Sequence, residues 1–303
     1  MQFVKPIYKA VIPVAGLGTR MLPATKAIPK ELLPIYDRPL IEHVVKEAID
    51  GGIREIIFIT RSGKDAIENH FDAHYELEHR LVKKGKDKIL EDIVKIIPDE
   101  VKISSIRQAD ALGLGHAILC AKHLINNEPF AVLLPDVLVL DKKIREKDFS
   151  FLQLVNAWNN TGISQVMVEQ VDFNSIEKYG IVDTGGKKIS TFKTISIKGL
   201  IEKPDPQDAP SNLAVLGRYI LSPKLFDLLE KLKPGVGGEI QLTDALSKLL
   251  SLEGLNVLKT DADIYDCGNK LGYLSANLAV GMRDPKSRAT IHALFNKLIN
   301  NDF

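Results

Sequence analysis

Short apolar runs rich in β-branched residues alternate with longer stretches of helical periodicity along residues 1–140. In the segment 40–49, apolar residues recur every three or four positions and a Gly-Gly pair follows, which is typical of a helix and its C-terminal end. This alternation predicts an α/β fold on a mainly parallel sheet flanked by helices. We expect strands at 9–14, 55–60, 101–106 and 130–134, and crossover helices at 40–49 and 116–124.

A charged stretch over residues 64–95 separates the second and third of these strands. It has helical periodicity, but it is much longer than the usual connection of about two to six residues in an α/β unit. We therefore expect an inserted helical hairpin on the surface.

After residue 141 the apolar runs become short and closely spaced, with turns between them. Such a block predicts a mixed or antiparallel extension of the sheet that carries a second binding surface. We expect strands at 163–171, 180–182, 189–192, 199–202 and 214–220, and helices at 239–250, 271–282 and from residue 285. The chain then divides into residues 1–140, residues 141–270 on the same sheet, and C-terminal helices over 271–303.

Composition excludes several classes of protein. The chain has 40 Lys and Arg against 39 Asp and Glu, a net charge of +1, which argues against a nucleic-acid binder. Hydrophobic residues make up 45% and charged residues 26%, so a globular rather than disordered chain is expected. Two cysteines cannot build a disulfide framework, and no Cys/His cluster has the spacing of a zinc site.

The N-terminal region does not have the pattern of a targeting segment. Lys5 and Lys9 precede an apolar run over 10–15, but Pro13 and Arg20 are incompatible with a signal peptide. No uninterrupted apolar run reaches the roughly 18 residues of a membrane span. We expect a soluble, cytoplasmic protein with no membrane partner.

The loop after the first expected strand has the composition of a phosphate site. Gly16 and Gly18 leave backbone N–H groups open to an approaching phosphate. From Gly16 to Lys30 the loop carries three cations, Arg20, Lys26 and Lys30, and it carries no acid. A nucleotide phosphate loop is favoured over an ordinary turn with solvated cations.

Two common phosphate motifs do not fit this loop. A dinucleotide fingerprint would place a third glycine at Met21 and open a helix at once, which Pro23 and Pro29 prevent. A Walker-type loop needs Gly-Lys-Ser/Thr, which is absent.

The run GLGTRMLPATKAIPKELLP, which starts at Gly16, resembles the signature of the sugar-nucleotide pyrophosphorylase family, and within it of the bacterial UTP–glucose-1-phosphate uridylyltransferases. The resemblance continues over nearly the whole chain, through QADALGLGHAI, LLPD, KYGIV, LIEKP, GGEIQLTD and YDCGNKLGY. The insertion at 64–95 favours the uridylyltransferase branch over the shorter thymidylyltransferases.

The resemblance implies a Rossmann-like nucleotidyltransferase fold and a magnesium-dependent reaction. In it, UTP and glucose 1-phosphate give UDP-glucose and pyrophosphate, because a sugar phosphate oxygen attacks the α-phosphorus in line. No protein nucleophile is needed, so positioning and charge neutralisation supply most of the catalysis.

The resemblance also assigns residues to the nucleotide and the metal. Arg20 holds the leaving pyrophosphate, with Lys30 and Lys26 adding charge nearby. Asp136 and Asp266 jointly hold Mg²⁺. The implied nucleotide-binding residues are Ala15, Gly16, Gly18, Thr19, Lys26, Glu31, Gln108 and Gly113, of which Gln108 and Gly113 face the uracil edge.

At the sugar, Lys203 is expected to grip the phosphate of glucose 1-phosphate and Glu202 to bond hydroxyl groups. Gly180 lets the hexose approach the backbone, and Glu239 and Gln241 are further hydroxyl partners. Read without the resemblance, each of these residues has an ordinary alternative: a solvated loop cation, an aspartate that caps a turn, or a surface Glu-Lys pair.

Other conspicuous residues are expected to have no part in the chemistry. The histidines have no catalytic spacing, with His116 the one to watch because it follows the loop that begins at Gln108. Cys267 has no task in this reaction. The apolar positions of the tail, Ile291, Leu294, Phe295 and Leu298, suit either core packing or the interface of a homodimer or homotetramer.

Two rival functions differ in class from this enzyme. The first is a non-catalytic paralogue that binds the sugar nucleotide or an active subunit, against which Arg20, Asp136, Lys203 and Asp266 are all present. The second is an NAD-dependent oxidoreductase, which Met21 and the loop prolines oppose.

Overall fold

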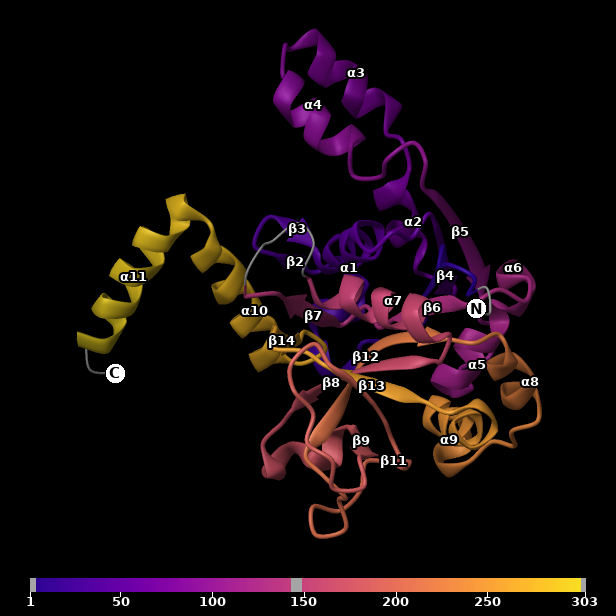
Figure 1. Cartoon of the computed structure of the whole chain (residues 1–303). Helices are drawn as coiled ribbons and strands as arrows, with labels where there is room; N and C mark the ends of the chain where they lie inside the picture. The colour runs from indigo at the N-terminus through magenta and orange to yellow at the C-terminus, as the bar shows by residue number, and fades with distance from the viewer. Residues whose placement is uncertain (1–3, 143–148, 301–303) are drawn as a thin grey trace.

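The computed structural model describes residues 4–142 and 149–300, so the expected segments over 1–3, 143–148 and 301–303 lie outside the described residues. In the described part of the chain, one central sheet has ten strands (Figure 1). Its main path runs β10-β13-β8-β12-β6-β1-β4-β5, and the pair β9–β11 attaches to β12. The strands are β1 (Lys9–Pro13), β4 (Glu55–Thr60), β5 (Lys102–Arg107), β6 (Phe130–Leu133), β8 (Gln165–Gln170), β9 (Gly180–Asp183), β10 (Thr194–Ser196), β11 (Gly199–Glu202), β12 (Leu213–Leu221) and β13 (Asn256–Lys259).

Along the main path of this sheet, four of the seven neighbouring strand pairs are parallel. β1 pairs in parallel with both β4 and β6, and β4 with β5, so the carboxyl ends of these four strands meet at one edge. β12 is antiparallel to β6 and β8, and it joins the second half of the chain to the first. Two small sheets complete the strands: β2 (Pro34–Ile35) with β3 (Arg38–Pro39), and β7 (Val137–Leu140) with β14 (Asp263–Asp266).

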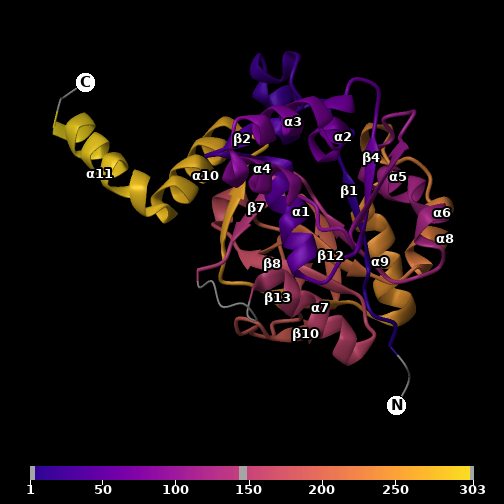
Figure 2. The same cartoon turned by 90° about the horizontal axis from the view of Figure 1, so that it is seen from above.

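Helices cover both faces of the sheet (Figure 2). One apolar core lies under α5 (Gly113–Cys120), α6 (Lys122–Ile125), α8 (Lys224–Glu230) and α9 (Leu242–Glu253). The other lies under α1 (Leu40–Asp50), α2 (Asp65–Phe71) and α7 (Ser150–Thr161). Side chains alternate between the two cores: along β6, Phe130 and Val132 face the first, and Ala131 and Leu133 the second. Each large apolar side chain buried in this way contributes about 1.5–3 kcal/mol.

Two helical pairs stand away from this body (Figure 1). One is the hairpin of α3 (Tyr75–Lys83) and α4 (Asp87–Val94), and the other is the C-terminal arm of α10 (Lys270–Arg283) and α11 (Pro285–Asn300). The arm begins where the Asn269 side chain accepts a hydrogen bond of 2.9 Å from the Gly272 amide, which is an N-cap. Of the helices that the structure describes, none is both long enough and apolar enough to cross a bilayer.

The structure confirms the expected strand pattern of the first 140 residues and the helical insertion at 64–95. The strand expected at 189–192 is wrong. Phe192 has φ 55°, in the left-handed region, and its side chain packs on the second core. The strand forms just beyond it, as β10, where Thr194–Ser196 pairs with β13. The sequence patterns also did not predict α7, α8, β7 or β13.

Candidate active site

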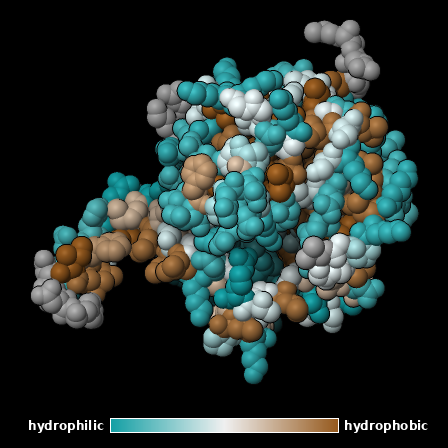
Figure 3. Space-filling model, turned by 90° about the horizontal axis from the view of Figure 1, so that it is seen from below, coloured by the Kyte–Doolittle hydropathy of each residue, from teal (hydrophilic) through white to brown (hydrophobic). Residues whose placement is uncertain are grey.

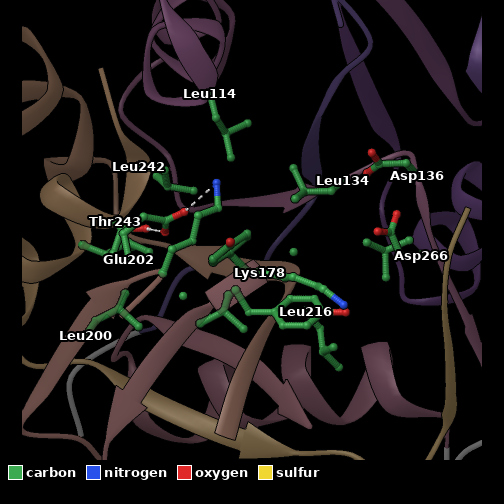
Figure 4. A pocket seen from close by; sticks show the side chains of 18 of the residues that line it. Leu114, Leu134, Asp136, Lys178, Leu200, Glu202, Leu216, Leu242, Thr243 and Asp266 are labelled. Atoms are coloured by element: carbon green, nitrogen blue, oxygen red, sulfur yellow. Dashed lines mark hydrogen bonds and ion pairs between the residues drawn. The ribbon is translucent and has the colours of Figure 1, made fainter. Parts of the chain in front are cut away.

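Two neighbouring cavities open at the edge of the sheet where β1, β4, β5 and β6 end. The loop cavity, of about 420 Å³, is lined by the segment after β1 and by Gln108. The other is called the bulge cavity because it lies beside a β-bulge in β12. Its volume is about 570 Å³, and it lies against β9, β11, β12 and the start of α9 (Figure 4). Leu134 and Asp136 line both, so the turn after β6 lies where the two cavities meet.

The expected site residues fall into these two cavities with one exception. The loop cavity is lined by Ala15, Gly16, Gly18, Thr19, Lys30, Glu31, Gln108, Gly113, Asp136 and Glu239. The bulge cavity is lined by Arg20, Asp136, Gly180, Glu202, Lys203, Gln241 and Asp266. Lys26 is exposed and lines neither, and Glu239, expected at the sugar, lies on the loop cavity.

The segment after β1 folds as a series of short turns. Gly18 has φ 67°, and a side chain there would also press on Lys30, at 3.3 Å from its Cβ. The Gly18 carbonyl accepts a hydrogen bond of 2.8 Å from the Thr25 hydroxyl. Only glycine takes this conformation without strain, and it keeps the loop close to Lys30.

The structure brings Asp136 and Asp266 together although 130 positions separate them in the chain. β7 and β14 pair so that Asp266 lies opposite Val137, and the Cys267 amide donates to the Asp136 carbonyl over 2.8 Å. A Cβ on Gly268 would lie 2.9 Å from one oxygen of Asp266 and 3.0 Å from one oxygen of Asp136. One guanidinium nitrogen of Arg20 lies 2.6 Å from the same point, so the two carboxylates and Arg20 share a space that only a glycine leaves free.

Cations from the glycine loop reach this acidic pair. Lys30 Nζ lies 2.6 Å from Asp136 Oδ2, and the guanidinium of Arg20 lies 3.7 Å from Asp136 and 3.3 Å from Asp266. Burial by itself raises the pKa of Asp136, but the charge and hydrogen bond of Lys30, with Arg20, hold that pKa below its usual value. For Lys30, burial lowers the pKa, but Asp136 outweighs it and the pKa is raised. Both groups are charged at neutral pH.

The acidic pair suits a magnesium ion that is shared with a substrate. Mg²⁺ in nucleotide sites is usually held by one or two carboxylates, and phosphate oxygens and water complete its shell. Asp136 and Asp266 offer two such carboxylates on one side of an open cleft. The donor set therefore fits a magnesium ion that is completed by phosphate.

Arg218 on β12 forms hydrogen bonds to the backbone of the turn that carries Asp136. This guanidinium is fully buried, and it donates to the carbonyls of Leu134 (2.9 Å) and Val137 (2.7 Å). It also forms a two-point ion pair with Glu47 on α1, at 2.9 and 2.8 Å. The turn thus has fixed carbonyls on both sides of Asp136.

At the far end of the bulge cavity, Glu202 and Thr243 lie together, away from Asp136 and Asp266 (Figure 4). The Thr243 hydroxyl donates to Glu202 Oε2 over 2.6 Å, and Lys203 Nζ lies 3.4 Å from Glu202 Oε1. A Cβ on Gly180 would come within 3.3 Å of the same Glu202 oxygen. Lys203 has φ 46°, a strained conformation of the kind found at functional sites.

Glu169 is a further acid on the bulge cavity that the sequence reading did not select. Among the described residues, its carboxylate has no hydrogen-bond or ion-pair partner, whereas the carboxylates of Asp136, Asp266 and Glu202 each have a donor. Burial raises the pKa of Glu169 to about 7. Its carboxyl group is therefore partly protonated near neutral pH.

Gln108 lies at the other end of the site, after β5, and is buried. Its Nε2 lies 3.2 Å from the Gly113 carbonyl and 3.0 Å from His116 Nδ1, so these two groups hold the amide in place. The sequence reading expected Gln108 to donate and accept at once toward a base. In the structure its donor group is engaged within the protein, and Oε1 is the atom left for a ligand.

Two expected residues have roles within the protein framework. The Glu31 carboxylate is buried and accepts a bond of 2.7 Å from Lys64 Nζ, while its Oε1 has no partner among the described residues. Gln241 Nε2 donates to Glu239 Oε2 over 3.0 Å.

For Cys267, burial and the nearby Asp266 raise the pKa of the thiol to about 12, so it stays protonated.

The sheet is mainly parallel, and its strand ends carry a glycine loop, loop cations and two facing carboxylates. This arrangement is typical of a nucleotide-transferring protein. The chain belongs to the family described as nucleotidyl transferase, whose model matches residues 9–282. It is 49% identical over 278 residues to the UTP–glucose-1-phosphate uridylyltransferase of Haemophilus influenzae, covering 92% of this chain and 94% of the relative. The enzyme of that name in Escherichia coli is 47% identical over 277 residues, with 91% of each chain covered.

Solved structures show the same likeness. A UDP-glucose pyrophosphorylase from Acinetobacter baumannii has a TM-score of 0.89 and 44% identity, covering 96% of this chain and 99% of that one. A UTP-bound structure from the same organism has a TM-score of 0.87, also at 44% identity, covering 97% and 99%.

Proposed function

We propose that the protein transfers UMP from UTP to glucose 1-phosphate, giving UDP-glucose and pyrophosphate. The observation that carries this proposal is the meeting of Asp136, Asp266, Arg20 and Lys30 at the junction of two cavities. Relatives over nine-tenths of the chain bear the name of this activity, which supports the choice of substrates.

The reaction needs two polyanions to be brought together. An oxygen of the sugar phosphate attacks the α-phosphorus of UTP, a new O–P bond forms, and the bond from the α-phosphorus to the bridging oxygen breaks, so that pyrophosphate leaves. Charge on the transferring group is stabilised by groups already in place.

UTP would occupy the loop cavity and glucose 1-phosphate the bulge cavity. Backbone N–H groups from Ala15 to Thr19 would hold phosphate oxygens, and Arg20 and Lys30 would take the charge of the leaving pyrophosphate. Gln108 Oε1 would accept from the uracil ring, beside the backbone of Gly113. Glu31, fixed by Lys64, would shape the loop behind Lys30, and Lys26 would contribute only long-range charge.

The sugar phosphate would be read from the opposite end. Lys203 would hold its phosphate, and Glu202, oriented by Thr243, would accept bonds from hydroxyl groups. Gly180 leaves room for the hexose beside Glu202, and Gln241 lies at the rim. Glu239, which lies on the loop cavity, would act by orienting Gln241.

Asp136 and Asp266 would hold Mg²⁺, which supplies charge neutralisation and alignment of the two phosphates when bound. Lys30 and Arg20 form ion pairs with the same carboxylates. Their charged groups would therefore also lie within reach of the phosphate oxygens of a bound triphosphate.

The proposal divides the chain by task. Residues 1–140 would bind the nucleotide, residues 141–270 the sugar phosphate on the same sheet, and residues 271–303 would join subunits into a homodimer or homotetramer. Leu294, Phe295 and Leu298 are exposed on the projecting α11, where apolar side chains gather (Figure 3). UTP and sugar phosphates are intracellular metabolites, so the enzyme would work in the cytoplasm without nucleic-acid or membrane partners.

The test is pyrophosphate release, measured for the four common nucleoside triphosphates against glucose, galactose and mannose 1-phosphates, with and without Mg²⁺. We expect release with UTP and glucose 1-phosphate that depends on Mg²⁺. No release with any pair, together with tight binding of UDP-glucose, would favour a non-catalytic paralogue instead. Protection from trypsin by NAD but not by UTP would favour the oxidoreductase.

A further inference from the structure

Arg218 has no role in the reaction proposed above. It is nevertheless the largest fully buried side chain in the described part of the protein. A buried guanidinium is costly unless its donors are all placed. Three of its nitrogens make four bonds of 2.7–2.9 Å, to the Glu47 carboxylate and to the Leu134 and Val137 carbonyls. The position is therefore built for a guanidinium and not for a generic cation.

The two carbonyls flank the turn of Pro135 and Asp136. A second contact ties the same turn to β12, because the Leu134 amide donates to the Gly217 carbonyl over 2.9 Å. Gly217 has φ 75°, and a Cβ there would lie only 2.6 Å from the Leu134 side chain. Arg218 and Gly217 thus hold the turn before and after Asp136.

These two residues lie in a bulge of β12. Between Val215 and Tyr219 the strand advances four residues while β8 advances only two, from Val168 to Val166. A bulge of this kind re-aims a side chain next to a functional site. Residues of the same bulge line the bulge cavity, so one strand segment touches both the proposed sugar site and the back of the Asp136 turn.

We propose that Arg218 is a positioning residue for Asp136. By fixing the carbonyls on either side of the turn, it sets the direction in which the Asp136 carboxylate meets Asp266. This role rests on the proposed function, in which the two carboxylates hold the metal. Glu47 neutralises the buried guanidinium, but it does not touch the turn.

The test compares Arg218→Lys with Glu47→Gln. Lysine keeps the charge but cannot span both carbonyls and Glu47, whereas Glu47→Gln leaves the bonds from Arg218 to the carbonyls intact. The readout is the dissociation constant of Mn²⁺, used as a probe for Mg²⁺, measured by electron paramagnetic resonance with UTP present. Thermal unfolding is measured in parallel.

We expect Arg218→Lys to weaken Mn²⁺ binding about tenfold, the low end of what the loss of a supporting contact costs a metal site. Glu47→Gln should lower the unfolding temperature but leave Mn²⁺ binding within about twofold of wild type. Equal Mn²⁺ affinity in wild type and Arg218→Lys would overturn the proposal. So would an equal loss in both variants, because general loosening would then explain it.

A double variant, Arg218→Met with Glu47→Gln, removes the buried pair without leaving an unpaired charge. If Arg218→Lys does not fold, this variant carries the comparison, and the same tenfold loss of Mn²⁺ affinity is expected. The ranking of variants by Mn²⁺ binding does not depend on turnover. A wild-type protein that binds Mn²⁺ with UTP but forms no UDP-glucose would contradict the proposed function and leave the role of Arg218 open to the same comparison.

Discussion

At the scale of single residues, the centre of the site is a set of ion pairs between cations of the glycine loop and two aspartates from other elements. Lys30 is nearly buried and pairs with Asp136, while Arg20 is 60% exposed on its side chain and bridges both acids. Each cation comes from a loop with no acid of its own before Glu31, so its partners must arrive from β6 and β14. Within this group of four residues, the two positive and the two negative charges balance.

Arg20→Ala should lower turnover by about a hundredfold or more, because a preorganised charge contact to the leaving pyrophosphate is lost. The initial rate of UDP-glucose formation at saturating substrates measures this. Lys26→Ala is the matched control, since Lys26 belongs to the same loop but lines neither cavity, and it should change turnover less than about threefold. Wild-type turnover in Arg20→Ala would remove Arg20 from the mechanism.

Glu169 gives a prediction about pH. Its pKa of about 7 in the folded protein is above the ordinary value of 4.5, so between these two values the folded state binds more protons than the unfolded state. The stability contributed by this group is therefore present below about pH 4.5 and is lost as pH rises through about 7. The loss amounts to about 1–3 kcal/mol at a half-buried site.

Glu169→Gln should remove this loss, so the variant should gain stability relative to wild type between about pH 5 and about pH 8. Urea unfolding at both pH values checks this. Glu177→Gln, at an exposed carboxylate eight positions further along the chain, is the control and should show no such gain. A difference between wild type and Glu169→Gln that does not change with pH would contradict the raised pKa.

At the scale of elements, the glycine loop and the first strands were predictable because local signals determine them. Gly16, Gly18 and the loop cations are close in sequence, and β1, β4 and β6 each contain a short apolar run. The partners that complete the site could not be found this way. Thr243 and Arg218 act through Glu202 and Asp136, which lie about 40 and 80 residues away in sequence, and only the sheet brings them together.

The bulge in β12 shows the same limit. The expected strand at 214–220 was placed correctly, but nothing in its apolar pattern indicates two extra residues relative to β8. Its single local signal is Gly217, which takes a positive φ. The error at 189–192 has a similar cause, since Phe192 is placed by the apolar core and not by strand pairing.

The turn at the end of β11 carries the next prediction. Lys203→Ala should raise the KM for glucose 1-phosphate more than that for UTP, because the ammonium group would contact only the sugar phosphate. Lys203→Gly is the matched control: it also removes the ammonium, but it relieves the positive φ of 46°. We expect the two variants to share the KM change and to differ in unfolding temperature. A larger change in the KM for UTP would reassign Lys203 to the nucleotide.

At the scale of the whole molecule, one sheet carries both halves of the proposed reaction. β12 returns from the second half of the chain to pair with β6, which places the proposed sugar site beside the nucleotide loop. The C-terminal arm does not line either cavity and projects from the body (Figure 2). Its exposed apolar side chains are available for a subunit contact.

Replacing Phe295 and Leu298 by serine should lower the molar mass measured by sedimentation equilibrium, from that of a dimer or tetramer toward that of one chain. Burial of such side chains at an interface is the expected source of the subunit affinity. An exposed polar position on the same helix provides the control: Lys297→Ser should leave the molar mass unchanged. A monomeric wild-type protein would contradict the assigned role of the arm.

The central claim is that uridylyl transfer occurs where Asp136 and Asp266 meet. The most direct measurement is UDP-glucose formed from UTP and glucose 1-phosphate at increasing Mg²⁺, by wild type, Asp136→Asn and Asp266→Asn, with circular dichroism to verify folding. We expect Mg²⁺-dependent product from wild type, one UDP-glucose for each pyrophosphate, and rates at least about a hundredfold lower in both folded variants. Wild-type rates in either folded variant, or no product from wild type at any Mg²⁺ concentration, would contradict the claim.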